Sequence, residues 1–207
     1  MSDRNLTRRS FMKVAAGTGA GLVLGACVPA KALTRTNKKA AKSESNFAPN
    51  VWVAVDPSGI VSITVSKVEI GQGVRTGLAM IVADELEVDW KDVSYAQGPA
   101  GKEFINPAIG NQITGGSSSV KGFFDPLRKA AATVREMLIS AAAQQWGVSP
   151  ETLRARNGEV FQPNSSLRLK YGALLEAASK ITPPAEPKLK DPKDFKYIGK
   201  SITSQKI

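Results

Sequence analysis

Histidine is absent from this 207-residue sequence, and cysteine occurs only once, as Cys27. Without histidine, the chain cannot use Ser-His-Asp or Cys-His catalysis, and it cannot bind a metal through imidazole. One cysteine cannot hold an iron–sulfur cluster or form an internal disulfide bond. Any redox role must therefore use a bound organic or metal–organic cofactor, held mostly by backbone and hydroxyl groups.

Long runs of like charge are also absent, although 28 Lys and Arg against 18 Asp and Glu give a net charge of +10. The basic residues are scattered and lack aromatic partners at stacking spacing, so we expect no nucleic-acid partner. The length and the hydrophobic content of 42% suit one globular domain with tails.

Residues 1–32 indicate an export signal rather than part of the fold. A basic start precedes an uncharged run of small and apolar residues that is too short to span a bilayer comfortably. Arg8 and Arg9, followed by Phe11 and Lys13, resemble the twin-arginine signal S-R-R-x-F-L-K, whose route exports folded proteins. We therefore expect a periplasmic protein; an ordinary secretory signal is the alternative.

Two processing sites fit the end of this segment. The letters LGAC at 24–27 resemble a lipoprotein box, in which Cys27 would carry a lipid that anchors the protein to a membrane. The letters AKA at 30–32 instead fit ordinary cleavage after Ala32. Residues 33–46 are polar and rich in lysine and serine, and they indicate a flexible linker in either case.

Alternating apolar residues predict β-structure within the folded part, residues 47–180. The segments 51–56 and 60–66 alternate on either side of the turn sequence D-P-S-G, which predicts a hairpin. A further short strand is expected over 93–96, and a small hairpin within 158–170.

Helical spacing of apolar residues predicts two longer helices, over 74–87 and 124–147. Asp125 is expected to cap the second helix, with Pro126 in its first turn. The fold class expected is α+β, with β-hairpins and a short mixed sheet packed on the two helices. Residues 181–207 are rich in proline and lysine and are expected to form an extended tail.

Two glycine-rich stretches lie before the predicted helices. GQGVRTG at 71–77 resembles a dinucleotide-binding loop, but Thr76 stands where that fingerprint needs glycine. TGGSSSVKGF at 114–123 lacks the ending of a phosphate-binding P-loop. Together they predict contacts from two sides to one large polyoxygenated ligand; for the first stretch, a tight turn before a core helix is the alternative.

Long motifs in a fixed order carry a family resemblance: KVEIGQGVRTGLAMIVADELEVDW, TGGSSSVKGFFDPLRKAAATVREML, AAAQQWGV and LKDPKDFKYIGK. They resemble the molybdopterin-binding large subunit of the xanthine dehydrogenase and aldehyde oxidase family, in its isoquinoline 1-oxidoreductase β-subunit type. The resemblance implies that 47–180 is the N-terminal portion of a molybdopterin-binding domain. It also implies that 181–207 leads toward a second domain.

The resemblance implies which residues contact the cofactor, expected in its cytosine dinucleotide form. Gln72, between Gly71 and Gly73, would contact an apical ligand of the molybdenum, and no side chain would bond the metal. The second loop would lie against the pterin through Thr114, Gly115, Gly116, Ser117 and Ser118.

The reaction implied is hydroxylation of an N-heterocycle or oxidation of an aldehyde, with oxygen from water. The implied partners are the remainder of the large subunit, a separate [2Fe–2S] subunit, a membrane cytochrome and a small-molecule substrate. The family's catalytic glutamate has no counterpart here, since Glu69, Glu85 and Glu87 are expected to be solvated or structural.

We therefore expect the isolated chain to be inactive, as a truncated product, a frameshifted piece or one subunit of a split enzyme. The alternative function is a non-catalytic exported or lipid-anchored scaffold that kept the fold and lost the chemistry.

Overall fold

The computed structural model describes residues 46–202; the predicted export signal, Cys27 and nearly all of the predicted linker lie outside this range. The described part combines two three-stranded sheets with two long helices, so the predicted α+β class is confirmed. Within it, no helix has both the length and the apolar character needed to cross a bilayer.

The first sheet is mixed, as predicted. Strand β1 (Val53–Val55) pairs antiparallel with β2 (Val61–Val65), and β2 pairs parallel with β3 (Val93–Gln97). Alternate residues of β1 and β2 are buried, which gives the sheet one apolar face. Asp56 closes the turn between β1 and β2 by accepting hydrogen bonds from the backbone N–H and the hydroxyl of Ser58.

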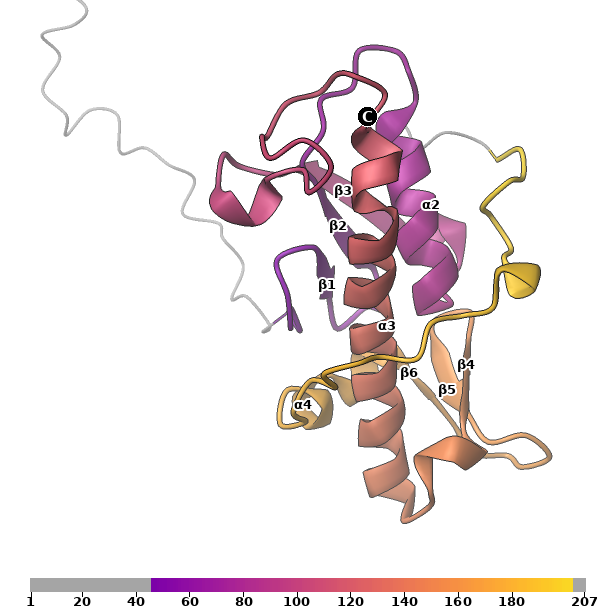
Figure 1. Cartoon of the computed structure of the whole chain (residues 1–207). Helices are drawn as coiled ribbons and strands as arrows, with labels where there is room; N and C mark the ends of the chain where they lie inside the picture. Colours follow the sequence, from indigo (N-terminus) through magenta and orange to yellow (C-terminus); the bar gives the residue numbers. More distant parts are fainter. Residues whose placement is uncertain (1–45, 203–207) are drawn as a thin grey trace, which may run out of the picture. The chain divides into compact units, whose positions relative to one another are not determined.

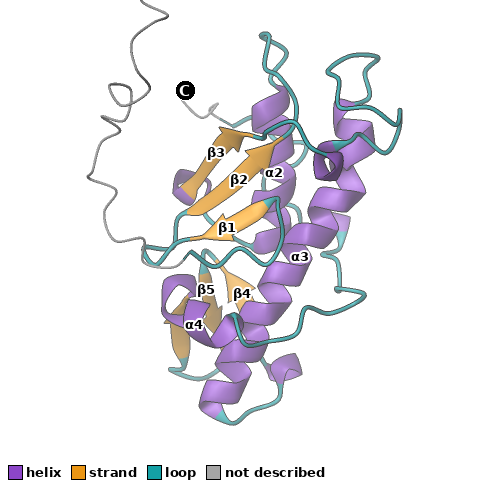
Figure 2. Cartoon of the chain, turned by 90° about the vertical axis from the view of Figure 1, so that its left-hand side faces the viewer, coloured by secondary structure: helices purple, strands orange, loops and turns teal. Residues whose placement is uncertain are grey.

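Both predicted long helices are present, as α2 (Val74–Leu86) and α3 (Ser119–Trp146). They pack against each other, and α2 also contacts β2 and β3. Figure 2 shows the first sheet in front of α2, with α3 alongside. The predicted apolar stripe of α3 is buried at Leu127, Ala131, Val134, Leu138 and Ala142.

The start of α3 differs from the sequence prediction. The helix begins at Ser119 instead of being capped by Asp125, so Pro126 lies inside the helix and not in its first turn. Phe123, in the additional turns, is 1% exposed and packs edge-on against Trp52, with 5.3 Å between ring centroids. An internal proline removes one helical hydrogen bond. The burial of the additional turns against the rest of the protein outweighs this local loss.

A second sheet follows α3. Strands β4 (Arg154–Arg156), β5 (Glu159–Phe161) and β6 (Arg168–Lys170) are antiparallel and lie in that order. Asn157 and Gly158 turn between β4 and β5 with φ angles of 52° and 74°, as a two-residue hairpin requires. The predicted small hairpin is therefore present as β5 and β6, with β4 added at its edge.

The last described part, 181–202, follows the short helix α4 (Leu175–Ala178) and is irregular apart from the 3-10 turn η6 (Pro192–Asp194) and a turn at 197–200. Figure 1 shows it in yellow, returning past α3 toward α2. The fully buried carboxylate of Asp84 holds residues 196–198 of this segment in place. Asp84 accepts hydrogen bonds of 2.6, 3.0 and 2.7 Å from the consecutive backbone N–H groups of Lys196, Tyr197 and Ile198.

The neighbouring carboxylate, Glu85, joins both helices to the same returning segment. It is fully buried and accepts hydrogen bonds from Arg128 Nε at 2.9 Å, Arg135 Nη1 at 2.8 Å and the Lys190 backbone N–H at 2.6 Å. Glu87, at the end of α2, forms ion pairs with Lys190 and with Lys196. Glu85 and Glu87 thus have structural roles, one of the two expectations for them.

Glu85→Gln is expected to lower the free energy of unfolding by about 3 kcal/mol, because it leaves the buried guanidinium of Arg128 and the partly buried one of Arg135 without their carboxylate partner. Urea unfolding at neutral pH, followed by circular dichroism, measures the change. Glu103→Gln is the matched control: it neutralises an exposed carboxylate and should change stability by less than about 0.5 kcal/mol. Equal stability of the two variants would contradict the role given to Glu85.

Candidate functional site

The two glycine-rich loops lie side by side near the N-terminal ends of α2 and α3 (Figure 1). Two hydrogen bonds join the segment that leads into the first loop to the start of the second loop. Lys67 Nζ donates to the backbone carbonyl of Ile113 at 2.5 Å, and the backbone N–H of Val68 donates to Thr114 Oγ1 at 2.9 Å. Segments 46 residues apart in the sequence therefore form one surface.

Lys67 lies beneath this junction with a fully buried side chain. Its ammonium group sits 5.0 Å from the ring centroid of Phe123, a cation–π contact. Burial lowers the pKa of Lys67, because desolvation disfavours the charged amine. Within residues 46–202, no carboxylate forms an ion pair with it.

Sequence reasoning missed Lys67, although a signal was present. Val61, Ile63 and Val65 point to the buried face of β2, and position 67 continues their two-residue spacing. A lysine in that register is either an interruption of the strand or a buried charge with a specific task. Here it provides one of the two hydrogen bonds between the loops.

In the first loop, Gln72 is exposed, but its amide group is turned back on the loop's own backbone. Its Nε2 donates to the carbonyl of Val68 at 2.9 Å, and its Oε1 accepts from the N–H of Ile70 at 2.7 Å. The flanking Gly71 and Gly73 have φ angles of 99° and 75°, which other residues adopt only at a cost. The loop thus holds an exposed glutamine between two glycines, with its neutral amide bonded to the loop's own backbone.

The carboxylate of Glu69 caps the N-terminus of α2. Its Oε1 accepts hydrogen bonds from the N–H groups of Gly71 and Gly73 at 2.8 and 2.9 Å, and its Oε2 accepts from Arg75 N–H at 3.2 Å. The hydrogen bond from Gly73 is the main cause that lowers the pKa of Glu69. These are the groups that would cradle a phosphate in a dinucleotide loop. Glu69 therefore has the structural role that was one of two expectations for it.

The second loop has one solvent-exposed side and one side that is held by hydrogen bonds. Gly115, Gly116 and Ser117 are exposed, and Gly116 and Ser117 have left-handed φ angles of 60° and 50°. Ser118 is only 4% exposed: its hydroxyl donates to the carbonyl of Gly115 at 2.8 Å and accepts from Asn106 Nδ2 at 2.9 Å. Of the predicted second-loop contacts, Gly115 to Ser117 face outward, whereas Ser118 braces the loop from inside.

Asn106 is a second residue that sequence reasoning did not single out. Its side chain is fully buried, and Nδ2 also donates to the Ser118 carbonyl at 3.1 Å. A Cβ added at Gly122 would lie 1.8 Å from Asn106 Oδ1, so α3 can approach only because that position is glycine. Asparagine in a loop is common, and only the tertiary contact reveals this task.

Exposed aliphatic side chains occur in both loops and in the segments next to them. Eight large hydrophobic side chains are exposed among the described residues, and six of them lie in or beside the loops: Val68, Ile70, Ile105, Ile109, Ile113 and Val120. We call this group the loop patch. Exposed apolar side chains that gather in one region are typical of surfaces that bind another molecule.

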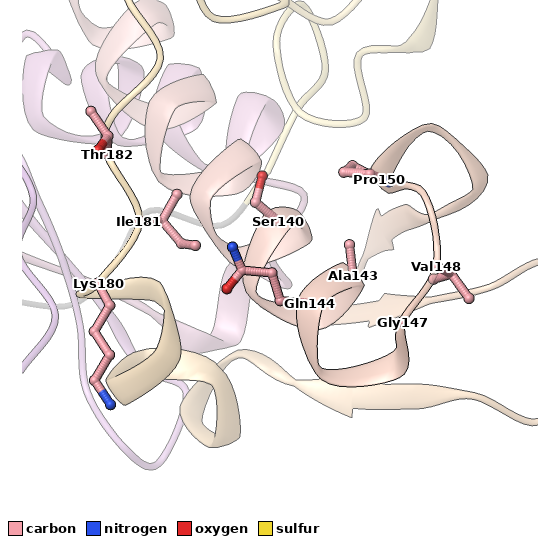
Figure 3. A pocket seen from close by; sticks show the side chains of 9 residues that line it. All are labelled: Ser140, Ala143, Gln144, Gly147, Val148, Pro150, Lys180, Ile181 and Thr182. Atoms are coloured by element: carbon pink, nitrogen blue, oxygen red, sulfur yellow. The ribbon is translucent and has the colours of Figure 1, made fainter.

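A pocket of about 630 Å³ lies elsewhere, beside the C-terminal half of α3 (Figure 3). Its one charged residue, Lys180, directs its ammonium group to Glu176 at 2.9 Å instead of into the pocket. Convergent polar groups are what small-molecule sites need for orientation. The loops are therefore the better candidate site. The pocket is lined by Ser140, Ala143, Gln144, Gly147, Val148, Pro150, Lys180, Ile181 and Thr182.

A family profile described as "Molybdopterin cofactor-binding domain" matches residues 3–203. The chain belongs to the molybdopterin cofactor-binding domain family. The predicted resemblance and the predicted cofactor class, molybdopterin, are thereby confirmed. Within residues 46–202, no cluster of three or more His, Cys, Asp or Glu side chains could hold a metal ion directly.

Three curated relatives of the chain are several times longer than it is. The beta subunit of isoquinoline 1-oxidoreductase from Brevundimonas diminuta is 40% identical over 172 residues, 82% of this chain and 22% of that protein. The membrane-bound aldehyde dehydrogenase (pyrroloquinoline-quinone) of Gluconacetobacter polyoxogenes is 31% identical over 71% of this chain and 18% of its own. A nicotinate dehydrogenase subunit from Pseudomonas putida is 32% identical over 73% of this chain and 12% of its own.

Lys67→Met is expected to loosen the junction between the two loops. Losing a charge-assisted hydrogen bond to Ile113 should speed hydrogen exchange of the neighbouring Val68 amide about tenfold. Nuclear magnetic resonance of the full chain measures that rate. Lys102→Met, which changes an exposed lysine, should leave it unchanged. Unaltered Val68 protection in Lys67→Met would contradict the linking role of Lys67.

Proposed function

We propose that the chain supplies two molybdopterin-contacting loops to a larger exported molybdenum hydroxylase or aldehyde oxidoreductase. The joining of the loops through Lys67 and Thr114 is the observation that carries the proposal. Family membership supports the cofactor class. Because the chain spans only 12% to 22% of the three relatives, the remainder of the large subunit would complete the site.

The residues of the loops fit a polyoxygenated cofactor. A Cβ added at Gly71, Gly73, Gly115 or Gly116 would meet no atom within 4 Å, so the outer sides of both loops are open to a ligand. Exposed backbone N–H and hydroxyl groups of the second loop can donate hydrogen bonds to oxygen and nitrogen atoms of a pterin. In the proposal these contacts come from Gly115, Gly116, Ser117 and Thr114, with Ser118 supporting them.

Gln72, which lies between Gly71 and Gly73, is the residue that we propose contacts the reacting end of the cofactor. Its two hydrogen bonds, to Val68 and Ile70, are exposed and can be exchanged for bonds to water or to a ligand at small cost. When bound, the cofactor supplies the redox chemistry; Gln72 would donate or accept a hydrogen bond that orients its ligands.

The proposed reaction is hydroxylation beside a ring nitrogen or oxidation of an aldehyde, with oxygen from water. The names of the relatives, which mention isoquinoline, nicotinate and aldehyde, support this substrate range. Two relatives are named as subunits, which supports further chains as partners. We propose the remainder of the large subunit, a [2Fe–2S] subunit and a membrane cytochrome, with the cofactor in its cytosine dinucleotide form. The loop patch offers the remainder of the large subunit an apolar surface to cover.

Purification from a host that makes the cofactor tests this function. The complex of the tagged full chain with the remainder of the large subunit should retain molybdenum and a cytosine-dinucleotide pterin, measured by mass spectrometry. Gln72→Ala should lower retention about tenfold, the effect of about one lost hydrogen bond. Gln145→Ala, an exposed glutamine at the far end of α3, is the matched control and should retain both.

The second candidate function is an exported or lipid-anchored scaffold without cofactor. It is favoured by the internal bonding of the first loop, where Gln72 and Glu69 both bond to the loop's own backbone. Under this alternative, the purified full chain and its complex would contain neither molybdenum nor pterin, and Gln72→Ala would behave as the wild-type chain does.

We further propose export by the twin-arginine route, with Cys27 as the lipid-anchored residue in the mature protein. The pattern of Arg8, Arg9, Phe11 and Lys13 supports the route. Replacing both arginines with lysine should shift the protein from the membrane fraction, where the lipid on Cys27 would hold it, to the cytosol in cell fractionation. An unchanged membrane fraction would indicate the ordinary secretory route instead.

A further inference from the structure

The first loop of the candidate site has a feature that its glycine spacing does not explain. Three backbone N–H groups, of Gly71, Gly73 and Arg75, converge on a single carboxylate, that of Glu69. The residue before α2 is Gly73, which has no side chain to cap the helix, and the first turn of α2 contains no acidic residue. Glu69 therefore supplies from outside the helix both the hydrogen-bond acceptor and the negative charge that a helix N-terminus favours.

We propose that Glu69 is a positioning residue, which holds the backbone on both sides of Gln72 and closes the N-terminus of α2 to phosphate. This inference rests on the proposed function, in which Gln72 orients the ligands of the cofactor. It adds the residue that sets the position of Gln72. It also explains why the first loop would contact the cofactor through a neutral amide and would not bind a phosphate.

The hydrogen-bond pattern separates the backbone of Gln72 from its side chain. Glu69 bonds the N–H groups of Gly71 and Gly73, the two residues that flank Gln72. The amide of Gln72 bonds different groups, the carbonyl of Val68 and the N–H of Ile70. Gln72 can therefore release its own two bonds and turn outward while Glu69 keeps the loop in shape.

Charge supports the same role. Hydrogen bonds, chiefly from Gly73, lower the pKa of Glu69, and the charge of Arg75 adds to the effect, so the carboxylate is ionised at neutral pH. A phosphate at the same place would have to displace a covalently tethered anion that already bonds the three amides. The negative charges of the Glu69 carboxylate and of a phosphate beside it would repel each other. The loop is therefore closed to phosphate as long as Glu69 is present.

The test uses the full chain with three variants, Glu69→Ala, Glu69→Asp and Glu69→Gln, and Glu103→Gln as an exposed control. In the wild type, the amide signals of Gly71, Gly73 and Arg75 should shift together in an acid titration followed by nuclear magnetic resonance. Their common midpoint should lie below the ordinary glutamate value of about 4.3. Inorganic phosphate should leave these signals in place in the wild type and shift them in Glu69→Ala.

Molybdenum retention gives a readout that a simple capping role would not move. Glu69→Ala should lower retention about tenfold, as Gln72→Ala does, whereas Glu69→Gln should stay within about twofold of wild type because its amide oxygen can still accept hydrogen bonds. If Glu69→Ala fails to fold, Glu69→Asp decides, since its side chain is one methylene too short to reach all three amides and should lower retention as well.

Each outcome has one meaning for the two proposals. If Gln72→Ala loses molybdenum while Glu69→Ala and Glu69→Asp retain it, the positioning role is wrong and the proposed function stands. If the shared acid midpoint and the phosphate response of Glu69→Ala appear, but the complexes of the variants and of the wild type all lack molybdenum, the closing of the helix N-terminus stands and the proposed function is wrong. A phosphate response in the wild type would overturn the role of Glu69.

Discussion

Two adjacent buried carboxylates, Asp84 and Glu85, set the constraint on which the rest of the fold depends. An ionised carboxylate without water must be surrounded by cations or N–H groups. Glu85 meets this need with Arg128 and Arg135 of α3, and Asp84 meets it with three backbone N–H groups near residue 197. The end of α2, the middle of α3 and the returning C-terminal segment are thereby held in one arrangement.

That arrangement determines where the loops lie. With α2 and α3 joined through Glu85, both helices begin at the same end of the fold, as Figure 1 shows. The loops that precede them are then neighbours, although they are far apart in the sequence. Lys67 and Thr114 complete the junction with one hydrogen bond each. Glu85, at the C-terminal end of α2, and Lys67, before its N-terminal end, thus both help to fix the relative position of the two loops.

Local patterns in the sequence predicted the hairpin, both long helices, the glycine loops and the family, because alternation, helical spacing and turn chemistry depend on neighbouring residues. They did not predict contacts between distant segments. The first turns of α3 form because Phe123 is buried against Trp52, which no residue near Pro126 signals. Asn106 and Lys67 look ordinary in the sequence, and their tasks appear only where the chain folds back. Cys27 and the signal segment lie outside the described residues, so those predictions stay predictions.

The first loop shows why similar glycine spacing can precede different chemistry. A strand, a glycine turn and a helix leave several N–H groups free at the helix N-terminus, and these attract an anion. In a dinucleotide loop the ligand supplies that anion. Here Glu69, two residues before Gly71, supplies it from within the chain. Because Glu69 already bonds these N–H groups, none of them is left for a phosphate. The polar side chain that remains exposed in the loop is the uncharged glutamine Gln72. The carboxylate before the first glycine, more than the Thr76 that breaks the fingerprint, separates this loop from a nicotinamide site.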